Sequence, residues 1–128
     1  MIIDSSAIIA IEFEEPGFER LVNKIGEAEA VLIGVPTMFE TAMVPSRRRG
    51  HEARLWLRGF LRSVDAEAVP FTEEHLDAAV DAFLRFGRGR HRAALNFGDC
   101  MAYAVAAVAG MPLLYTGNDF AQTDIPGA

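Results

Sequence analysis

Four short apolar runs are the feature of this sequence that most constrains its fold. They lie at Met1–Ile3, residues 30–36, residues 66–71 and residues 112–116. Short runs that are apolar almost throughout are typical of strands buried on both faces, and segments with helical spacing separate them. This order predicts an α/β fold with a central parallel sheet of about four or five short strands, flanked by helices on both faces.

Capping signals predict where two of the helices begin. Thr37 and Glu40 have the three-residue spacing of a capping box, which places a helix directly after the second apolar run. The last long helix is expected from about Asp99 to Ala109, because Gly110 follows as a typical C-terminal residue. Asp99 therefore stands at the start of an otherwise apolar helix.

A third helix is expected between residues 73 and 86, with Thr72 as its cap. Its large apolar residues recur at helical spacing and form one stripe. The stripe consists of Leu76, Val80, Phe83 and Leu84.

Length and composition indicate one folded domain over residues 1–128. Of the 128 residues, 51% are hydrophobic, which is enough for a sizeable core. The longest apolar run, residues 101–115, is interrupted by Gly110 and Pro112 and is shorter than the roughly 18 residues that span a bilayer. The N-terminus lacks the basic segment of a signal peptide. We therefore expect a soluble cytoplasmic protein with no membrane partner.

The charged residues are distributed unevenly along the chain. The net charge of −6 argues by itself against binding to nucleic acid. Eleven of the 12 basic residues are arginines, however, and ten of these lie between Arg47 and Arg92. An arginine-rich middle after an acidic first third can still create a local positive face.

Acidic residues recur where strands end or helices begin. They are Asp4, Glu40, Asp99 and Asp119. If the strands are parallel and adjacent, these four carboxylates converge at one edge of the sheet. Two like charges 4 Å apart repel by about 4 kcal/mol at an effective dielectric constant of 20, whereas a helix N-terminus returns only about 0.3–1 kcal/mol.

Such a cluster requires a cation or partial protonation. Oxygen ligands without His or Cys favour Mg²⁺ or Mn²⁺, which can lower the pKa of a water molecule and support hydrolysis of a phosphodiester. Taken singly, three of the four acids also have an ordinary interpretation, whereas the charge of Asp4 at the end of a buried strand has little structural use. Asp99 can be a helix cap, Glu40 the partner of Thr37 in a capping box, and Asp119 a turn residue.

Several motifs together resemble the PIN-domain ribonucleases, and more narrowly the VapC toxins of bacterial type II toxin–antitoxin systems. The motifs are "MIIDSSAIIAI" at the start, "TMFETAMV" around residue 40, and "LNFGDCMAYAVAAVAGMPLLYTGNDF" near the end. The resemblance extends from Met1 to Asp124 with the elements in the family's order. It implies a parallel sheet between helices, which agrees with the fold predicted from the apolar runs.

The resemblance also implies a site, a reaction and partners. The acidic residues that bind Mg²⁺ or Mn²⁺ in the family correspond to Asp4, Glu40, Asp99 and Asp119. Many relatives have an acidic residue where this chain has Asn118, so either Asp119 or a neutral oxygen of Asn118 fills the fourth position. Ser6 and Thr116 correspond to hydroxyl residues that hold water or metal.

The implied reaction is hydrolysis of RNA by a metal-activated water, which leaves a 5′-phosphate and a 3′-hydroxyl. The implied partners are a VapB-type antitoxin and a second copy of the chain, within a higher toxin–antitoxin assembly.

Two groups of basic residues are candidates for binding RNA. One side of a predicted helix carries Arg47, His51, Arg54, Arg58 and Arg62, which form either a track for the RNA backbone or a solvated face paired with acids. The better candidate is the glycine-rich segment before Asp99, since a basic loop beside a metal site suits substrate phosphates. Its arginines are Arg85, Arg88, Arg90 and Arg92.

Two other functions remain as alternatives. A catalytically degenerate PIN module would act only by binding protein or RNA, and Asn118 is the residue that favours this possibility. A metal-dependent phosphatase of small substrates is disfavoured, because no phosphate-binding glycine loop follows a strand.

Overall fold

A parallel sheet forms the centre of the computed structural model, which describes residues 1–44, 50 and 52–128. Within these residues the sheet has four strands in the order β3-β2-β1-β4, and each neighbouring pair is parallel. The strands are β1 (Ile2–Ile3), β2 (Val31–Gly34), β3 (Ala66–Val69) and β4 (Leu113–Leu114). The predicted fold class is confirmed.

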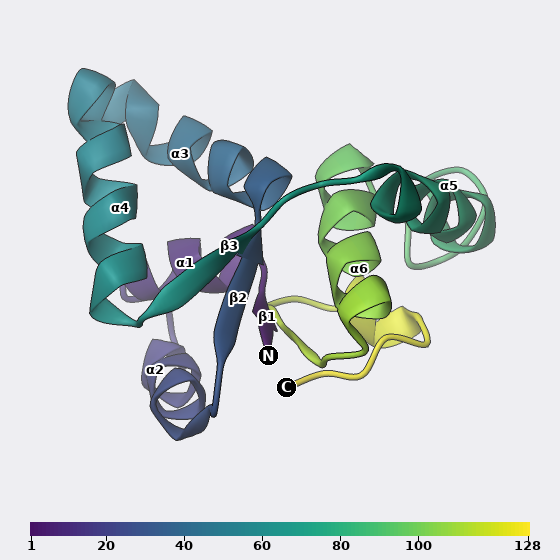
Figure 1. Cartoon of the computed structure of the whole chain (residues 1–128), viewed down its shortest axis with the longest axis horizontal. Helices are drawn as coiled ribbons and strands as arrows, with labels where there is room; N and C mark the ends of the chain where they lie inside the picture. Colours follow the sequence, from purple (N-terminus) through teal and green to yellow (C-terminus); the bar gives the residue numbers. More distant parts are fainter.

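Helices cover both faces of this sheet. They are α1 (Ser5–Glu12), α2 (Phe18–Glu27), α3 (Val35–Arg49), α4 (Ala53–Ser63), α5 (Glu73–Phe86) and α6 (Phe97–Ala109). In Figure 1, α5 and α6 lie on one side of the sheet, and α1, α2 and α4 lie on the other. Because α6 runs opposite to the strands, its N-terminus lies at the edge where β1 and β2 end (Figure 1).

Neighbouring residues of the short strands enter two separate cores, because successive side chains of a strand point to opposite faces. Ile2 and Leu113 pack in the core beneath α5 and α6. Ile3 and Leu114 pack in the second core, against residues of α1, α2 and α4. All four side chains are at most 2% exposed. Burial on both faces is the physical reason why these strands are apolar without alternation.

The capping box predicted at Thr37 and Glu40 is wrong. α3 begins at Val35, directly after β2, so both residues lie within the helix. Thr37 is buried, and its carbonyl oxygen accepts a hydrogen bond from Thr41 Oγ1 at 2.7 Å. Pro36 explains the early start, because a proline fits the first turn of a helix, where its missing N–H leaves no bond unmade.

The helix expected after Thr72 is confirmed, but its apolar stripe faces outward. Thr72 caps α5, and its backbone N–H donates to His75 Nδ1 at 3.1 Å. The buried positions of α5 are His75, Ala79 and Ala82, and α5 packs closely on α6. The stripe residues are 43–52% exposed; they are Leu76, Val80, Phe83 and Leu84. The small alanines permit the close helix contact, so the large side chains remain at the surface.

α6 contains most of the longest apolar run and ends where the sequence predicts. Its last residue is Ala109, and Gly110 follows with a left-handed backbone (φ 62°). The backbone N–H of Met111 then donates to the carbonyl oxygen of Ala106 at 3.1 Å. In the described part of the chain, no helix is long and apolar enough to cross a membrane.

Gly34 provides a test of the close packing between the sheet and α6. A Cβ atom at this position would lie 2.8 Å from Val105 Cγ2, and the β-branched Val105 side chain has little freedom to move. We expect Gly34→Ala to destabilise the protein by about 1–3 kcal/mol, as measured by urea denaturation.

Two further variants control this measurement. Gly26→Ala lies within α2 and its Cβ would meet nothing within 4 Å, so it should be neutral or stabilise by about 0.5–1 kcal/mol. Adding Val105→Ala to Gly34→Ala should cost less than the sum of the two single changes. Additive costs would show that the close contact is not the cause.

Candidate active site at the carboxyl edge of the sheet

Asp4 lies at the end of β1, where a carboxylate is buried. Its side chain is 3% exposed and caps α1. Asp4 Oδ2 accepts hydrogen bonds from the backbone N–H of Ser6 at 2.9 Å and from Ser6 Oγ at 2.5 Å. Ser6 Oγ in turn accepts from the backbone N–H of Thr116 at 3.1 Å. The Ser6 hydroxyl therefore links the ends of β1 and β4 and fixes the orientation of Asp4.

Asp99 lies in the first turn of α6, not at its cap. The helix begins two residues earlier than predicted, and Asn96 is the N-cap. The backbone N–H of Asp99 donates to Asn96 Oδ1 at 2.9 Å, and that of Asn96 donates to Asp99 Oδ2 at 2.8 Å. Asn96 supplies the N-cap that the sequence analysis assigned to Asp99, so the interpretation of Asp99 as a plain cap is wrong.

Glu40 reaches the same edge from α3 and meets the N-terminus of α6 at Gly98. A Cβ atom on Gly98 would lie 2.6 Å from Glu40 Oε2, so only glycine leaves room for this carboxylate. The side chain of Ser5 also hydrogen-bonds to Glu40. α1, α3 and α6 each contribute one part of this contact.

The three carboxylates interact electrostatically. Burial raises the pKa of Asp4, and the charge of Asp99 raises it further, although hydrogen bonds from Ser6 oppose this. Burial also raises the pKa of Glu40, with added contributions from Asp4 and Asp99. The pKa of Asp99 is raised by burial and by Asp119, and the hydrogen bond from Asn96 and the charge of Arg88 lower it. Asp4, Glu40 and Asp99 therefore converge as the parallel topology predicts.

The fourth acidic position is more open. Asp119 is exposed at the start of a short 3₁₀ helix, Phe120–Gln122. Its negative charge raises the pKa of Asp99. Asn118 is also exposed, and Thr116 is partly buried. Asp119 is thus the described acidic residue of this loop whose charge raises the pKa of Asp99, and Asn118 precedes it on the same loop.

The donor set suits a hard divalent cation. The polar groups that converge here are carboxylates and hydroxyls, and Cys100 points into the core instead. Among the described residues, no three Asp, Glu, His or Cys side chains are placed to hold a metal together as they stand. Asp4 and Asp99 each direct one oxygen to N–H groups of their own helix turn. Ligation by all three therefore requires side-chain rotation, while the excess negative charge favours a cation.

The arginines of the basic segment have different surroundings. Arg88 is exposed and close enough to Asp99 to lower its pKa. The Arg90 guanidinium lies over the ring of Phe83, with its Cζ 5.3 Å from the ring centroid, and Arg92 is exposed. These three remain candidates for contact with a charged ligand.

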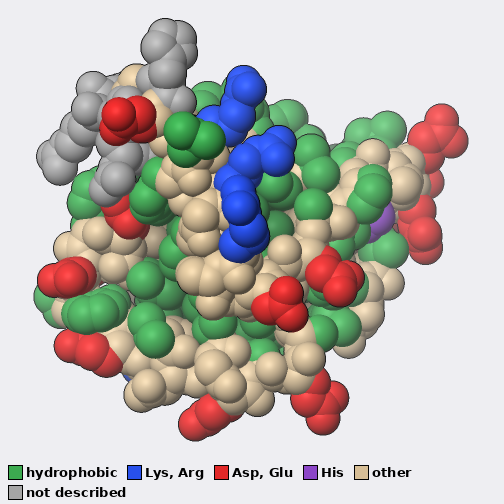
Figure 2. Space-filling model, turned by 60° about the vertical axis from the view of Figure 1, so that its left-hand side comes forward, with side chains coloured by type: hydrophobic (Ala, Val, Ile, Leu, Met, Phe, Trp, Pro, Cys, Tyr) green, Lys and Arg blue, Asp and Glu red, His purple; other side chains and the backbone are tan. Residues whose placement is uncertain are grey.

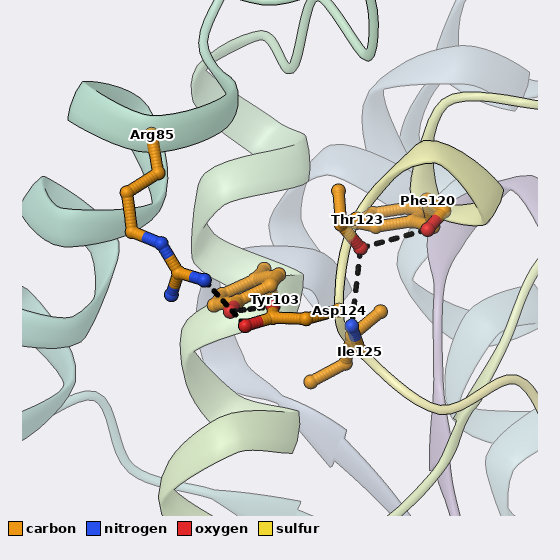
Figure 3. Close-up of polar contacts among 6 residues, drawn as sticks. All are labelled: Arg85, Tyr103, Phe120, Thr123, Asp124 and Ile125. Carbon is orange, nitrogen blue, oxygen red and sulfur yellow. Dashed lines mark hydrogen bonds and ion pairs between the residues drawn. The ribbon is translucent and has the colours of Figure 1, made fainter.

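Arg85 has an internal partner. Its guanidinium donates to Asp124 Oδ2 at 2.5 Å, and the hydroxyl of buried Tyr103 donates to Asp124 Oδ1 at 2.5 Å (Figure 3). These bonds lower the pKa of Asp124, and burial with the Asp124 bond raises the pKa of Tyr103 to about 12. Arg85 thus joins α5 to the C-terminal segment, which weakens the prediction that it contacts RNA.

The second group of basic residues lies on α4, away from the carboxyl edge (Figure 1). Arg54, Arg58 and Arg62 are exposed there. Figure 2 shows Lys and Arg side chains gathered in one band, among hydrophobic and acidic side chains. Arg47 and His51 lie outside the described residues.

Sequence reasoning missed three residues that shape the site. The side chain of Ser5 contacts Glu40, and no local pattern indicates this contact. The contact of Gly98 with Glu40 depends on how α3 and α6 pack. Asn96 precedes Asp99 by three residues, which is the spacing of a capping box and could have identified it as the cap.

Comparison with known proteins shows which family this architecture represents. The family model described as "PIN domain" matches residues 1–126. Ribonuclease VapC36 of Mycobacterium tuberculosis is 42% identical over 126 residues, which cover 98% of this chain and 91% of that protein. Ribonuclease VapC of Mycolicibacterium smegmatis is 38% identical over 125 residues, which cover 98% and 97%.

Two solved structures share the fold. A crystal structure of Mycobacterium tuberculosis VapC20, described as a sarcin–ricin-loop-cleaving toxin, superposes with a TM-score of 0.77 at 18% identity over 99% of this chain and 97% of that one. A toxin–antitoxin complex from Klebsiella pneumoniae gives a TM-score of 0.72 at 14% identity over 96% and 92%. The chain therefore belongs to the PIN-domain family and, within it, to the group of VapC ribonucleases.

Proposed function

We propose that this chain is a Mg²⁺- or Mn²⁺-dependent endoribonuclease toxin. The observation that carries the proposal is the convergence of Asp4, Glu40 and Asp99 at the carboxyl edge of the sheet. The charge of Asp99 raises the pKa of Asp4 and of Glu40, and the charge of Asp4 also raises the pKa of Glu40. Relatives at 38–42% identity are named ribonucleases, which supports RNA as the substrate.

Asp4, Asp99 and Glu40 would hold the cation, and Asp119 would complete the set. When bound, a divalent cation would supply charge neutralisation at the scissile phosphate and a water molecule of lowered pKa. Hydrolysis at this site would join a water oxygen to phosphorus and break the bond from phosphorus to the 3′ oxygen, which would take up a proton. The products would be a 5′-phosphate and a 3′-hydroxyl.

The chain's own hydrogen bonds prepare these carboxylates for a cation. Ser6 donates twice to Asp4, which favours the ionised form that burial opposes. The first turn of α6 offers Asp99 a backbone N–H and the positive end of a helix dipole. Ser5 and Gly98 confine Glu40 to the same edge.

We also propose that a VapB-type antitoxin neutralises the chain and that the toxin forms a homodimer. Exposed apolar stripes support contacts with other proteins, because large apolar patches at a surface mark interaction sites. One stripe lies on α5, and the other lies on α3 at Val35, Phe39 and Met43. An arginine of the antitoxin is a suitable counter-charge for the carboxylates.

A degenerate, non-catalytic PIN module is the second candidate. The observation in its favour is that no three of the described carboxylates are placed to hold a metal together, and the neutral Asn118 stands where the resemblance to the family leads us to expect an acid. Metal binding and RNA cleavage, measured on the same preparation, decide between the two functions.

Removing one carboxylate should abolish both metal binding and catalysis. We expect Asp4→Asn and Asp99→Asn to lower RNA cleavage in Mg²⁺ by at least about 100-fold, and EDTA to stop the wild-type reaction. Mg²⁺ should also raise the melting temperature of the wild type but not of the variants. Asp65→Asn is the matched control, since it removes an exposed acid at the amino end of β3. Full activity in Asp4→Asn would contradict the site.

Gly98→Ala tests the contact between α6 and Glu40. The added methyl group would occupy the space of a carboxylate at the end of a flexible side chain, so the fold can adapt by displacing Glu40. We expect cleavage to fall by about 10–100-fold with little change in melting temperature. Gly59→Ala, whose Cβ would meet nothing within 4 Å, should leave cleavage unchanged. Equal cleavage by the two variants would show that Glu40 needs no such confinement.

The raised pKa values predict an unusual dependence of stability on pH. A carboxyl group whose pKa is raised on folding binds more protons in the folded state, so stability falls as pH rises from the unfolded pKa toward the folded one. Without metal, Asp4→Asn should therefore melt above the wild type at pH 7, and the difference should shrink toward pH 4. Thermal melts in EDTA measure this. A variant that melts below the wild type throughout would show that ionised Asp4 stabilises the apo fold.

A further inference from the structure

Phe97 is an exposed aromatic ring at the start of the helix that carries Asp99. It is 79% exposed, although aromatic side chains usually bury most of their surface. It is the first residue of α6 and precedes Gly98, which contacts Glu40, and Asp99, which belongs to the cluster. Its backbone is therefore in the helix turn that also carries Asp99.

The groove that Phe97 lines is mostly apolar, with one cation and one amide. It lies between α5 and α6, has a volume of about 560 Å³, and includes Leu76, Val80 and Phe83 of the α5 stripe. Arg88 and Asn96 are its polar lining residues. Arg88 also acts on Asp99, so this part of the groove adjoins the carboxylates. An aromatic face, an amide and a cation are thus available together beside the position expected for the scissile phosphate.

These three groups match the parts of a nucleotide. Proteins that bind single-stranded RNA stack unpaired bases on aromatic rings and contact the phosphates with arginine. Resting on the proposed ribonuclease function, we propose that Phe97 and Arg88 form a nucleotide subsite next to the carboxylates. Phe97 stacks on the base and Arg88 contacts its phosphate, so both are positioning residues for the RNA.

The surroundings of Phe97 differ from those of the other exposed ring near the site. Phe39, which is 69% exposed, lies between Val35 and Met43 on an apolar stripe of α3, which suits a protein partner. Phe97 instead stands between Asn96 and Gly98 at a helix start. Phe97 also lines the groove with the apolar side chains of α5, and it is Arg88 and Asn96 beside the ring that suit a nucleotide.

Fluorescence separates stacking from mere apolar contact. The probe is a short single-stranded RNA with one 2-aminopurine, bound to chains that carry Asp4→Asn to prevent cleavage. Binding should quench 2-aminopurine, and Phe97→Ala should weaken binding by about 5- to 150-fold with loss of the quench. Phe97→Trp should retain both effects, whereas Phe97→Leu, which keeps the apolar bulk, should lose both. Leu55→Ala on α4 is the control for removing an exposed apolar side chain, since Leu55 is 70% exposed.

Salt dependence tests the phosphate contact of Arg88. Arg88→Ala should reduce the slope of log K against log salt by about 0.7, the value expected for one phosphate of a single strand. Arg20→Ala on α2, an exposed arginine outside both candidate RNA-binding groups, should leave the slope unchanged. An unchanged slope for Arg88→Ala would overturn its assigned role.

The remaining outcomes distinguish the subsite from the proposed function. If Phe97→Leu binds RNA as the wild type does, or if Phe97→Ala changes only the oligomeric mass, the ring serves a protein interface and the stacking proposal is wrong. If the wild type cleaves RNA and Phe97→Ala is unaffected, the nuclease stands without the subsite. If the wild type shows ring-dependent quenching but no cleavage in Mg²⁺, the subsite stands and the nuclease does not.

Discussion

The burial of neighbouring carboxylates at one edge of a parallel sheet is the constraint on which the rest of the structure depends. Asp4 is 3% exposed, and a buried carboxylate beside others is costly unless hydrogen bonds or a cation offset the charge. The fold supplies the hydrogen bonds from Ser6, from Ser5 and from the first turn of α6. These bonds reduce the cost without removing it, since the pKa of each of the three carboxyls stays above its ordinary value. Instability of this kind is expected where residues are retained for chemistry.

Close packing brings the carboxylates together. α6 approaches the sheet through small residues, and Gly34 leaves no space for a side chain against Val105. The same helix meets Glu40 at Gly98, where a methyl group would not fit. Gly34 therefore permits the close approach of α6 to the sheet, and Gly98 leaves room for the Glu40 carboxylate at its first turn. The location of Asp99 follows from this packing, because Asp99 is in that turn.

The fold and the central acidic residues could be predicted because they depend on local and topological rules. Continuous apolar runs identify buried parallel strands, and parallel strands place Asp4 and the start of α6 at one edge. Helix boundaries failed where two signals competed. The spacing of Thr37 and Glu40 indicates a cap, yet Pro36 before them suits a first helical turn; Asp99 is a possible cap by position, yet Asn96 is the cap. The ion pair between Arg85 and Asp124 joins residues 39 positions apart, and no local pattern indicates it.

The orientation of α5 shows why a hydrophobic stripe does not by itself identify a core. Its large apolar residues have helical spacing, yet Ala79 and Ala82 face α6 while Leu76 and Phe83 face outward. An alanine face permits closer approach of two helices than a leucine face, and closer approach increases dispersion contacts along the whole interface. Leaving large side chains exposed forfeits roughly 1.5–3 kcal/mol for each one that could have been buried. The chain recovers this free energy only when another molecule covers the apolar stripe. A molecule that also covers the open acidic edge would block the site. This is the arrangement expected if inhibition is supplied by a separate polypeptide.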